Sequence, residues 1–251
     1  MHSALIAAVV FACLVTALLL GMWLRRLLPA HHLSAETKDT VRLAMGLVAT
    51  MTALLLGLLV SSAKGSYDTL RGDVIQMAAK ISLLDRMLTG YGTEAAEARA
   101  QLRTAVEGAV RRLWPEDGAA PSLGAANVHA GNAVYAAIQH LVPRDDAQRI
   151  VKTQAANLAV ELGELRELLL AQSVSSVSKP LLVVVALWLV VIFLSFSLLA
   201  PRNATATLAL VISALSVSGA IFLILELDRP FSGLIKISNQ PVLNALSQLG
   251  R

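Results

Sequence analysis

The sequence predicts an all-α, polytopic membrane protein with four transmembrane helices in a 2+2 arrangement and a helical extramembrane bundle between the second and the third. This prediction rests on four apolar stretches, none of which carries a charge in its middle. Each stretch is long enough, at ~1.5 Å per residue, to cross a hydrocarbon core of ~30 Å. The stretches form two pairs around a polar segment and cover about Ala4 to Leu28, Leu43 to Ser62, Pro180 to Ala200 and Thr205 to Leu225.

The pairing of the spans predicts how the chain is divided. We expect a first transmembrane pair over residues 1–62, a helical insert over 63–179, a second pair over 180–226 and an interfacial C-terminal segment over 227–251. Because the number of spans is even, the N-terminus, the insert and the C-terminal segment are expected on the same side of the membrane. Basic residues flank the spans on both sides in similar numbers, so the positive-inside rule leaves the side of the insert open.

The composition restricts the possible partners. The insert carries 13 acidic and 13 basic residues, so the net charge of +4 does not form a basic surface. Without such a surface and interleaved aromatic residues, we expect no nucleic-acid partner. The expected partners are the lipid bilayer and further copies of this chain. The single cysteine, Cys13, lies in the first span, so the sequence holds no disulfide framework and no CxxC pair.

The first span is expected to be a retained helix and not a cleaved signal. No basic region precedes it, and its apolar run is longer than the core of a signal peptide. It ends in Trp23, Leu24, Arg25 and Arg26 where a signal would have a small-residue cleavage site.

The second span is expected to continue into the insert as one helix from about Ser34 to Thr89. No proline interrupts it, and apolar residues recur beyond the span at three- and four-residue spacing. Such a helix is on the order of 80 Å long and extends well beyond the bilayer. Gly90, Tyr91 and Gly92 are expected to end it as a glycine cap and turn. The recurring apolar residues are Leu70, Val74, Met77, Ile81, Leu84 and Leu88.

The remainder of the insert is also predicted to be helical. Thr93 is expected to cap a helix from Glu94 to about Leu113, which has acids in its first turn and arginines in its last. Prolines at positions 115 and 143 end two of the helices. The expected order after Leu113 is a loop over Pro115 to Ala130, a helix over Asn132 to Leu141 and a long helix from Asp145 to about Ser173.

Catalytic motifs are missing from the sequence. It contains no phosphate-binding glycine loop, nucleophile elbow or HExxH. His31 and His32, with Glu36, are the one candidate metal group, but adjacent histidines on an interfacial turn more often sit in the headgroup layer. We therefore expect no enzyme activity, no cofactor and no metal.

A stripe of small residues that becomes polar follows one face of the second span. Its members fall within roughly 80° of one another on a helical wheel. Close helix packing explains most such stripes, because small residues let backbones approach. The alternative is a narrow, weakly polar pore wall formed by several copies around an axis. The stripe consists of Gly46, Thr50, Ala53, Gly57, Ser61, Lys64 and Asp68; a similar stripe in the fourth span consists of Ala206, Ala209, Ser213, Ser216 and Ala220. Only one of the two can face a central axis.

A structural junction is expected where the fourth span ends. Glu226 and Asp228 lie where the helix leaves the hydrocarbon, Pro230 fixes the direction of the chain, and Phe231 adds apolar area. We expect the segment from Glu226 to Ser238 to be ordered, with one acid approaching a basic residue at the membrane boundary. The expected basic partners are Lys64 and Lys179, and the expected interfacial apolar face consists of Phe231, Leu234 and Ile235. The segment is expected to lie against either the membrane or the insert.

Several motifs together resemble a known family. They are Arg25-Arg26-Leu27-Leu28-Pro29, Leu59 to Asp68, Leu83-Leu84-Asp85-Arg86, Tyr91-Gly92, Ala200 to Thr205 and Leu225 to Ser238. With these motifs the chain is similar, over nearly its whole length, to the bacterial bestrophin-like domain proteins of uncharacterised function. The resemblance implies a multi-pass protein of the bacterial cytoplasmic membrane. Bestrophins proper are pentameric anion channels whose second membrane helix lines the pore and whose helical domain lies between the second and third helices.

Two functions from different classes are therefore open. The first is an oligomeric channel or transport pore lined by the second span, for small ions and, by the resemblance, for anions. The chain departs from bestrophins proper because its second span lacks a phenylalanine- and isoleucine-rich neck, so matched selectivity residues do not support anion conduction. The second is a non-conducting membrane sensor or tether that acts through its helical insert.

Overall fold

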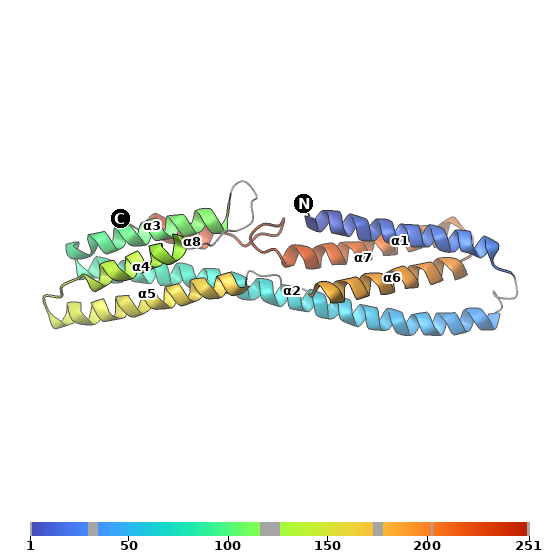
Figure 1. Cartoon of the computed structure of the whole chain (residues 1–251), viewed down its shortest axis with the longest axis horizontal. Coiled ribbons are helices and arrows are strands. Elements are labelled where there is room, and N and C mark those ends of the chain that lie inside the picture. Colours follow the sequence, from blue (N-terminus) through green and yellow to red (C-terminus); the bar gives the residue numbers. More distant parts are fainter. Residues whose placement is uncertain (1, 30–34, 116–125, 173–177, 202, 250–251) are drawn as a thin grey trace. The chain divides into compact units, whose positions relative to one another are not determined.

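The computed structural model describes residues 2–29, 35–115, 126–172, 178–201 and 203–249, and within these ranges every regular element is a helix (Figure 1). The all-α prediction is confirmed. The chain divides into two compact units. The first comprises Met1–Gly65 and Ser175–Asp228, and the second comprises Ser66–Val174 and Arg229–Arg251. The C-terminal segment therefore belongs to the same compact unit as the insert.

The first unit contains the four apolar helices. They are α1 (His2–Leu27), the first part of α2 (Ala35–Tyr91), α6 (Lys179–Leu199) and α7 (Ala204–Leu227). All four are long and apolar enough to cross a membrane, as predicted. Helix α1 packs against both α6 and α7.

Close backbone approach explains how tightly α1 and α6 pack. A Cβ added at Gly21 of α1 would lie 1.9 Å from the Oγ of Ser197 and 2.6 Å from the carbonyl oxygen of Leu194, both on α6. Only a glycine fits there without movement of a backbone group, and small residues allow such approach between membrane helices. At the start of α7, the side chain of Asn203 accepts a hydrogen bond of 2.8 Å from the backbone N–H of Ala206, which caps the helix.

Helix α2 is unbroken over 57 residues and belongs to both units. The prediction of one helix that continues from the second span into the insert is confirmed, although Ser34 lies outside the described residues. The helix contains no proline and ends at Tyr91. Gly92 follows with φ +118°, a left-handed conformation that glycine adopts without steric cost, so the predicted glycine turn is also confirmed.

The second unit is a helical bundle. It contains the end of α2, the short 3-10 helix η2 (Thr93–Ala95), α3 (Ala96–Leu113), α4 (Ala126–Gln139), α5 (Asp146–Gln172) and α8 (Gln240–Gln248). Helix α4 packs against α3 and α5, and α8 packs against α3. The apolar register that the sequence showed on α2 forms part of one buried core with residues of α3, α4, α5 and α8.

Two predicted boundaries in the bundle are wrong. Thr93 does not cap α3: it begins η2, and Ala95 occupies the cap position without a side-chain hydrogen bond. The chain turns sharply at Gly92, so the first residues after it form a tighter 3-10 turn. Helix α4 begins at Ala126, within the segment predicted as loop, although its first residues include asparagine and glycine, which have low helix propensity.

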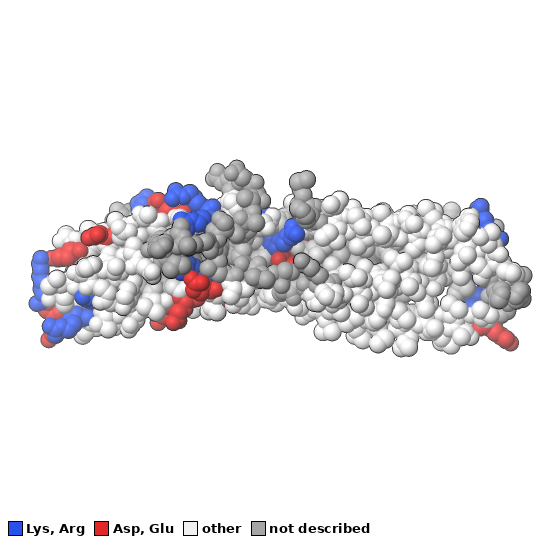
Figure 2. Space-filling view, viewed as in Figure 1, with Lys and Arg blue, Asp and Glu red and all other residues white. Residues whose placement is uncertain are grey.

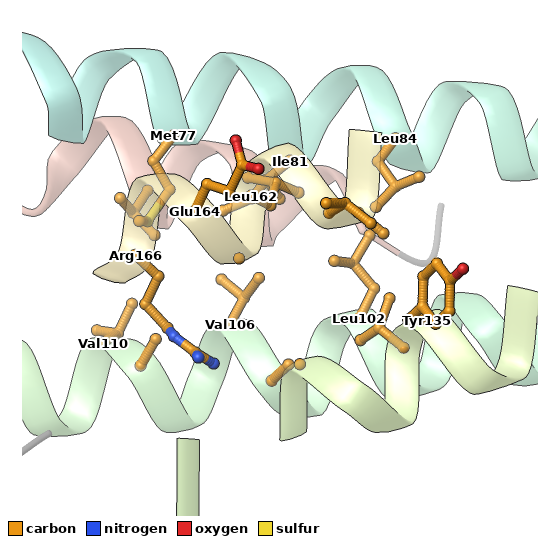
Figure 3. Close-up of a pocket in the computed structure, with 18 of the residues that line it drawn as sticks. Met77, Ile81, Leu84, Leu102, Val106, Val110, Tyr135, Leu162, Glu164 and Arg166 are labelled. Carbon is orange, nitrogen blue, oxygen red and sulfur yellow. The ribbon is translucent and has the colours of Figure 1, made fainter. Parts of the chain in front are cut away.

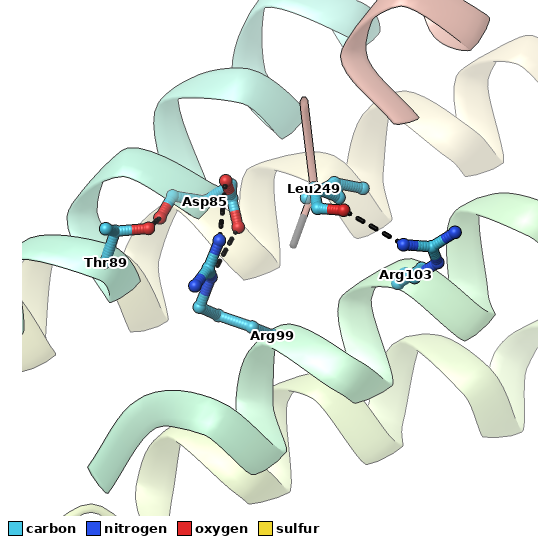
Figure 4. A network of polar contacts seen from close by, with 5 residues as sticks. All are labelled: Asp85, Thr89, Arg99, Arg103 and Leu249. Carbon is cyan, nitrogen blue, oxygen red and sulfur yellow. Dashed lines mark hydrogen bonds and ion pairs between the residues drawn. The ribbon is translucent and has the colours of Figure 1, made fainter. Parts of the chain in front are cut away.

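Ion pairs join α2 to its neighbours in the bundle. Arg99 Nε of α3 donates to Asp85 Oδ1 of α2 at 2.8 Å (Figure 4). A separate hydrogen bond links α3 to the C-terminal segment: Arg103 Nη1 donates to the carbonyl oxygen of Leu249 at 3.1 Å. Lys80 Nζ lies 2.8 Å from Glu161 Oε2, linking α2 to α5. The Asp85 side chain is only 10% exposed, so its pair with Arg99 is screened less by water than a surface pair.

Candidate functional site

The small-residue stripe of α2 lies on an outward face of the chain. All seven of its members are exposed, whereas Thr52, Leu59 and Ala63 on the opposite side of the same helix are buried. A Cβ added at Gly46 or Gly57 would meet nothing within 4 Å, in contrast to Gly21. The exposed residues are Gly46, Thr50, Ala53, Gly57, Ser61, Lys64 and Asp68. At these two glycines the stripe therefore does not serve close packing within the described part of one chain.

The chemistry of this face is weakly polar. Thr50 Oγ1 donates to the carbonyl oxygen of Gly46 at 2.6 Å, so the hydroxyl is already bonded to its own helix. Exposed leucines flank the stripe, so small residues lie between larger apolar ones. The flanking leucines are Leu43, Leu47, Leu54 and Leu58.

The stripe of α7 is also turned outward. Ala209, Ser213 and Ser216 are exposed, while Ala206 and Ala220 are half-buried. Both serines donate to carbonyl oxygens of their own helix at 2.9 Å. The exposure of the two stripes does not by itself distinguish which one faces an axis.

Charged side chains are distributed unevenly over the surface. On the face shown in Figure 2, the middle of the first unit is uncharged, and lysine, arginine and acidic side chains gather at the ends of that unit and on the bundle. An uncharged band of this kind is the surface expected of helices in contact with hydrocarbon.

The residues of the predicted junction occupy different environments. Glu226 is 4% exposed, Asp228 is half-buried, and Pro230 and Phe231 are buried. The pairing of Glu226 or Asp228 with Lys64 stays a prediction, and the side chain of Lys179 lies outside those described.

Phe231 lies against the insert, which is one of the two positions predicted for the C-terminal segment. Its ring packs edge-on against Trp114 of the bundle, with centroids 5.6 Å apart and an interplanar angle of 81°. Leu234, in contrast, is 82% exposed. Burial against a large aromatic ring withdraws more apolar area from water than a position on the surface, which explains the direction of Phe231.

The candidate metal group is not placed by the structure. His31 and His32 lie outside the described residues, and Glu36 is exposed. Within the described ranges, no three His, Cys, Asp or Glu side chains are grouped closely enough to hold a metal ion.

The bundle contains a cavity that the sequence did not predict. It has a volume of about 360 Å³ and is lined by residues of α2, α3, α4, α5 and α8 (Figure 3). Most of the lining is apolar, but Arg166 and Glu164 of α5 also reach it. The sequence shows only that Arg166 is one helical turn from the apolar residues Leu162 and Leu169.

The sequence matches the family described as Bestrophin-like domain over residues 12–242. The chain belongs to this family. The resemblance predicted from the motifs is thereby confirmed, and the matched range includes the α2 stripe and the residues of the junction. No curated protein sequence matches the chain.

A solved structure supports the bestrophin fold. The crystal structure of a bacterial bestrophin homologue from Klebsiella pneumoniae, which carries an isoleucine-to-threonine mutation, matches with a TM-score of 0.66. The match covers 99% of this chain and 100% of the other at 13% sequence identity. At this identity the match establishes the bestrophin-like fold, and ion specificity has to be argued from this chain's own residues.

Proposed function

We propose that this protein is an oligomeric membrane channel in which the α2 stripe of several copies surrounds a pore for small ions. One observation carries the proposal: all seven residues of the α2 stripe are exposed, while Thr52, Leu59 and Ala63 on the opposite side of the helix are buried. Membership of the bestrophin-like family supports the same conclusion.

The composition of the stripe fits a pore better than a lipid-facing surface. Lipid contacts favour large apolar side chains, which here are the flanking leucines, such as Leu54 at 67% exposure. Glycine, alanine and serine leave room near an axis, and the hydroxyls of Thr50 and Ser61 offer ions weak polar contacts. Weak contacts allow an ion to leave as well as to enter. Lys64 and Asp68 follow where the apolar span ends.

Anions are the first ions to test, because of the family resemblance. Charges of both signs end the stripe, so the residues of α2 do not select a sign by themselves. Purified protein in liposomes should release chloride down its gradient, and replacement of chloride or of the cation would identify the permeant species. Liposomes that remain tight to every small ion would contradict the channel and favour the sensor or tether.

A comparison of the Gly57→Leu and Leu58→Ile variants tests the role of the α2 stripe. A Cβ added at Gly57 meets nothing within 4 Å among the described residues, so the substitution should leave the fold of the subunit intact. Flux through the Gly57→Leu protein should be lost, or its oligomer disrupted, since bulk is added where copies or ions approach. Leu58→Ile should conduct as the parent does. Equal flux and equal oligomer size for the two variants would reject a special role for the stripe.

A further inference from the structure

The cavity of the bundle has the dimensions and the lining of a small-molecule site. Binding sites for small ligands are mostly apolar, measure about 300–1,000 Å³ and contain a few polar groups. Here a partly open space of about 360 Å³ is lined by side chains that include Met77, Ile81, Leu102, Val106, Leu162 and Val242. The apolar walls favour a hydrocarbon ligand, and the volume suits one chain better than the two chains of a phospholipid.

Arg166 provides the cavity with a cationic group. Its side chain is only 18% exposed, although it carries a charge. The guanidinium lies against α4 at Gly131, where an added Cβ would be 3.0 Å from Nη1, so the glycine leaves space for it. Arg166 Nη2 also donates to Glu167 Oε1, on a side chain that is 57% exposed. A guanidinium held in this way can bind a carboxylate through parallel hydrogen bonds.

The acidic group of the cavity lies on its other side. Figure 3 shows Arg166 directed towards Val106 and Val110 of α3, whereas the carboxylate of Glu164 is directed towards α2. Glu164 is exposed, so its charge is solvated and screened. Glu167, whose carboxylate accepts from Arg166 Nη2, is 57% exposed, so a ligand carboxylate would share the guanidinium with this solvated partner or replace it.

We propose that this cavity binds a single-chain fatty acid, with the acyl chain among the apolar side chains and the carboxylate on Arg166. The site is separate from the stripe of α2 and does not depend on ion conduction. It does involve α2 directly, because Met77 and Ile81 belong to that helix, so an acyl chain would add apolar contacts to its extramembrane part.

Trp114 lines the cavity, so its fluorescence can report the binding of a ligand there. The chain has three tryptophans, and Trp23→Phe with Trp188→Phe leaves Trp114 as the only one. In nanodiscs, where no detergent chain competes, a brominated dodecanoate should quench Trp114 fluorescence with saturation. The alcohol of the same chain length should bind more weakly. Linear quenching that is equal for the acid and the alcohol would mean partition into lipid and overturn the proposal.

Gly163→Leu tests the position of the acyl chain. Gly163 lines the cavity, and an added Cβ meets nothing within 4 Å, so the backbone here accepts a side chain that would take up cavity volume. Saturable quenching should disappear in this variant and persist in Gly163→Ala, which adds little volume. Unchanged quenching in the Gly163→Leu protein would exclude the cavity as the site.

Arg166→Gln tests the carboxylate contact, with Arg149→Gln on the same helix as the charge control. Arg149 is 68% exposed and does not line the cavity. Loss of a charge-assisted hydrogen bond should weaken binding of the acid roughly 10- to 100-fold and leave the alcohol unaffected. Equal affinity for the acid in the two variants would overturn the assignment of Arg166.

Discussion

Trp114 Nε1 donates a hydrogen bond of 2.8 Å to the carbonyl oxygen of Ile237, joining the end of α3 to the C-terminal segment. The same tryptophan ring packs edge-on against Phe231. Ile237 is 2% exposed and its N–H donates to the carbonyl oxygen of Pro230 at 2.8 Å, which closes the segment on itself. The C-terminal segment is therefore held to the bundle by both polar and apolar contacts.

Phe231→Ala should detach the C-terminal segment from the bundle. Loss of a buried phenylalanine costs about 3–5 kcal/mol, because its contacts disappear and a cavity remains. We expect a lower thermal midpoint of the purified protein and faster proteolysis after residue 228. Leu234→Ala, at an 82% exposed position, is the control and should change neither measurement. Matching proteolysis patterns for the two variants would contradict the anchoring role of Phe231.

Gly21→Ala should weaken the packing of α1 against α6. The added Cβ would collide with Ser197 Oγ and with the backbone carbonyl of Leu194, and overpacking of this kind costs about 1–3 kcal/mol. Ser197→Ala should restore only part of the lost stability, because the carbonyl at 2.6 Å remains. Gly219→Ala on α7, where a Cβ meets nothing, should be neutral or slightly stabilising. The thermal midpoints of the three variants are compared with that of the parent protein in one detergent. A Gly21→Ala protein as stable as the parent would show that α1 and α6 separate easily.

Asp85→Asn should destabilise the joint between α2 and α3. The substitution removes the carboxylate that accepts from Arg99 Nε at 2.8 Å in a largely buried position. Hydrogen bonds to charged groups contribute about 1.5–3 kcal/mol, and we expect a loss of this order. Asp146→Asn is the control, since its pair with Arg149 is exposed on both sides and should contribute little. If both variants unfold at the same temperature, the Asp85 pair is no stronger than a surface pair.

The free energy of unfolding should decrease at alkaline pH because of the buried hydroxyl of Tyr91. Burial, followed by the charge of Glu94, raises the pKa of Tyr91 above its ordinary value of 10.0. The unfolded chain then loses the phenolic proton first, so stability should decrease as the pH rises beyond about 10. The hydroxyl is buried without a hydrogen-bond partner among the described residues, so Tyr91→Phe should gain about 1 kcal/mol and flatten this dependence. Parallel stability curves for the two proteins between pH 9 and 11 would disprove the assignment.

Local sequence was sufficient to predict the long helices, but not α8 or the start of α4. In α2, the lack of proline and the recurrence of apolar residues at helical spacing both act within a few turns, so the long helix could be predicted from the sequence. The outward direction of the α2 stripe could not, because small residues suit both a packed and an open face. The burial of Thr52 and Ala63 on the opposite side was needed to decide that question for one chain.

Contacts between distant segments were not predictable in the same way. Nothing near Phe231 in the sequence indicates Trp114 as its neighbour, since the two meet only when the C-terminal segment returns to α3. The cavity beside Arg166 likewise depends on the spacing of five helices. Such features follow from how side-chain volumes fill a bundle, which the pattern of a single helix does not determine.

The exposed position of Cys13 makes it possible to count the chains in one assembly. The sequence contains a single cysteine, and the structure places it on an exposed face of α1. At most one thiol-reactive dye therefore attaches to each chain, and a small apolar reagent is required because Cys13 lies in the middle of an apolar span. The number of bleaching steps from one particle then reports how many copies of the chain that particle contains.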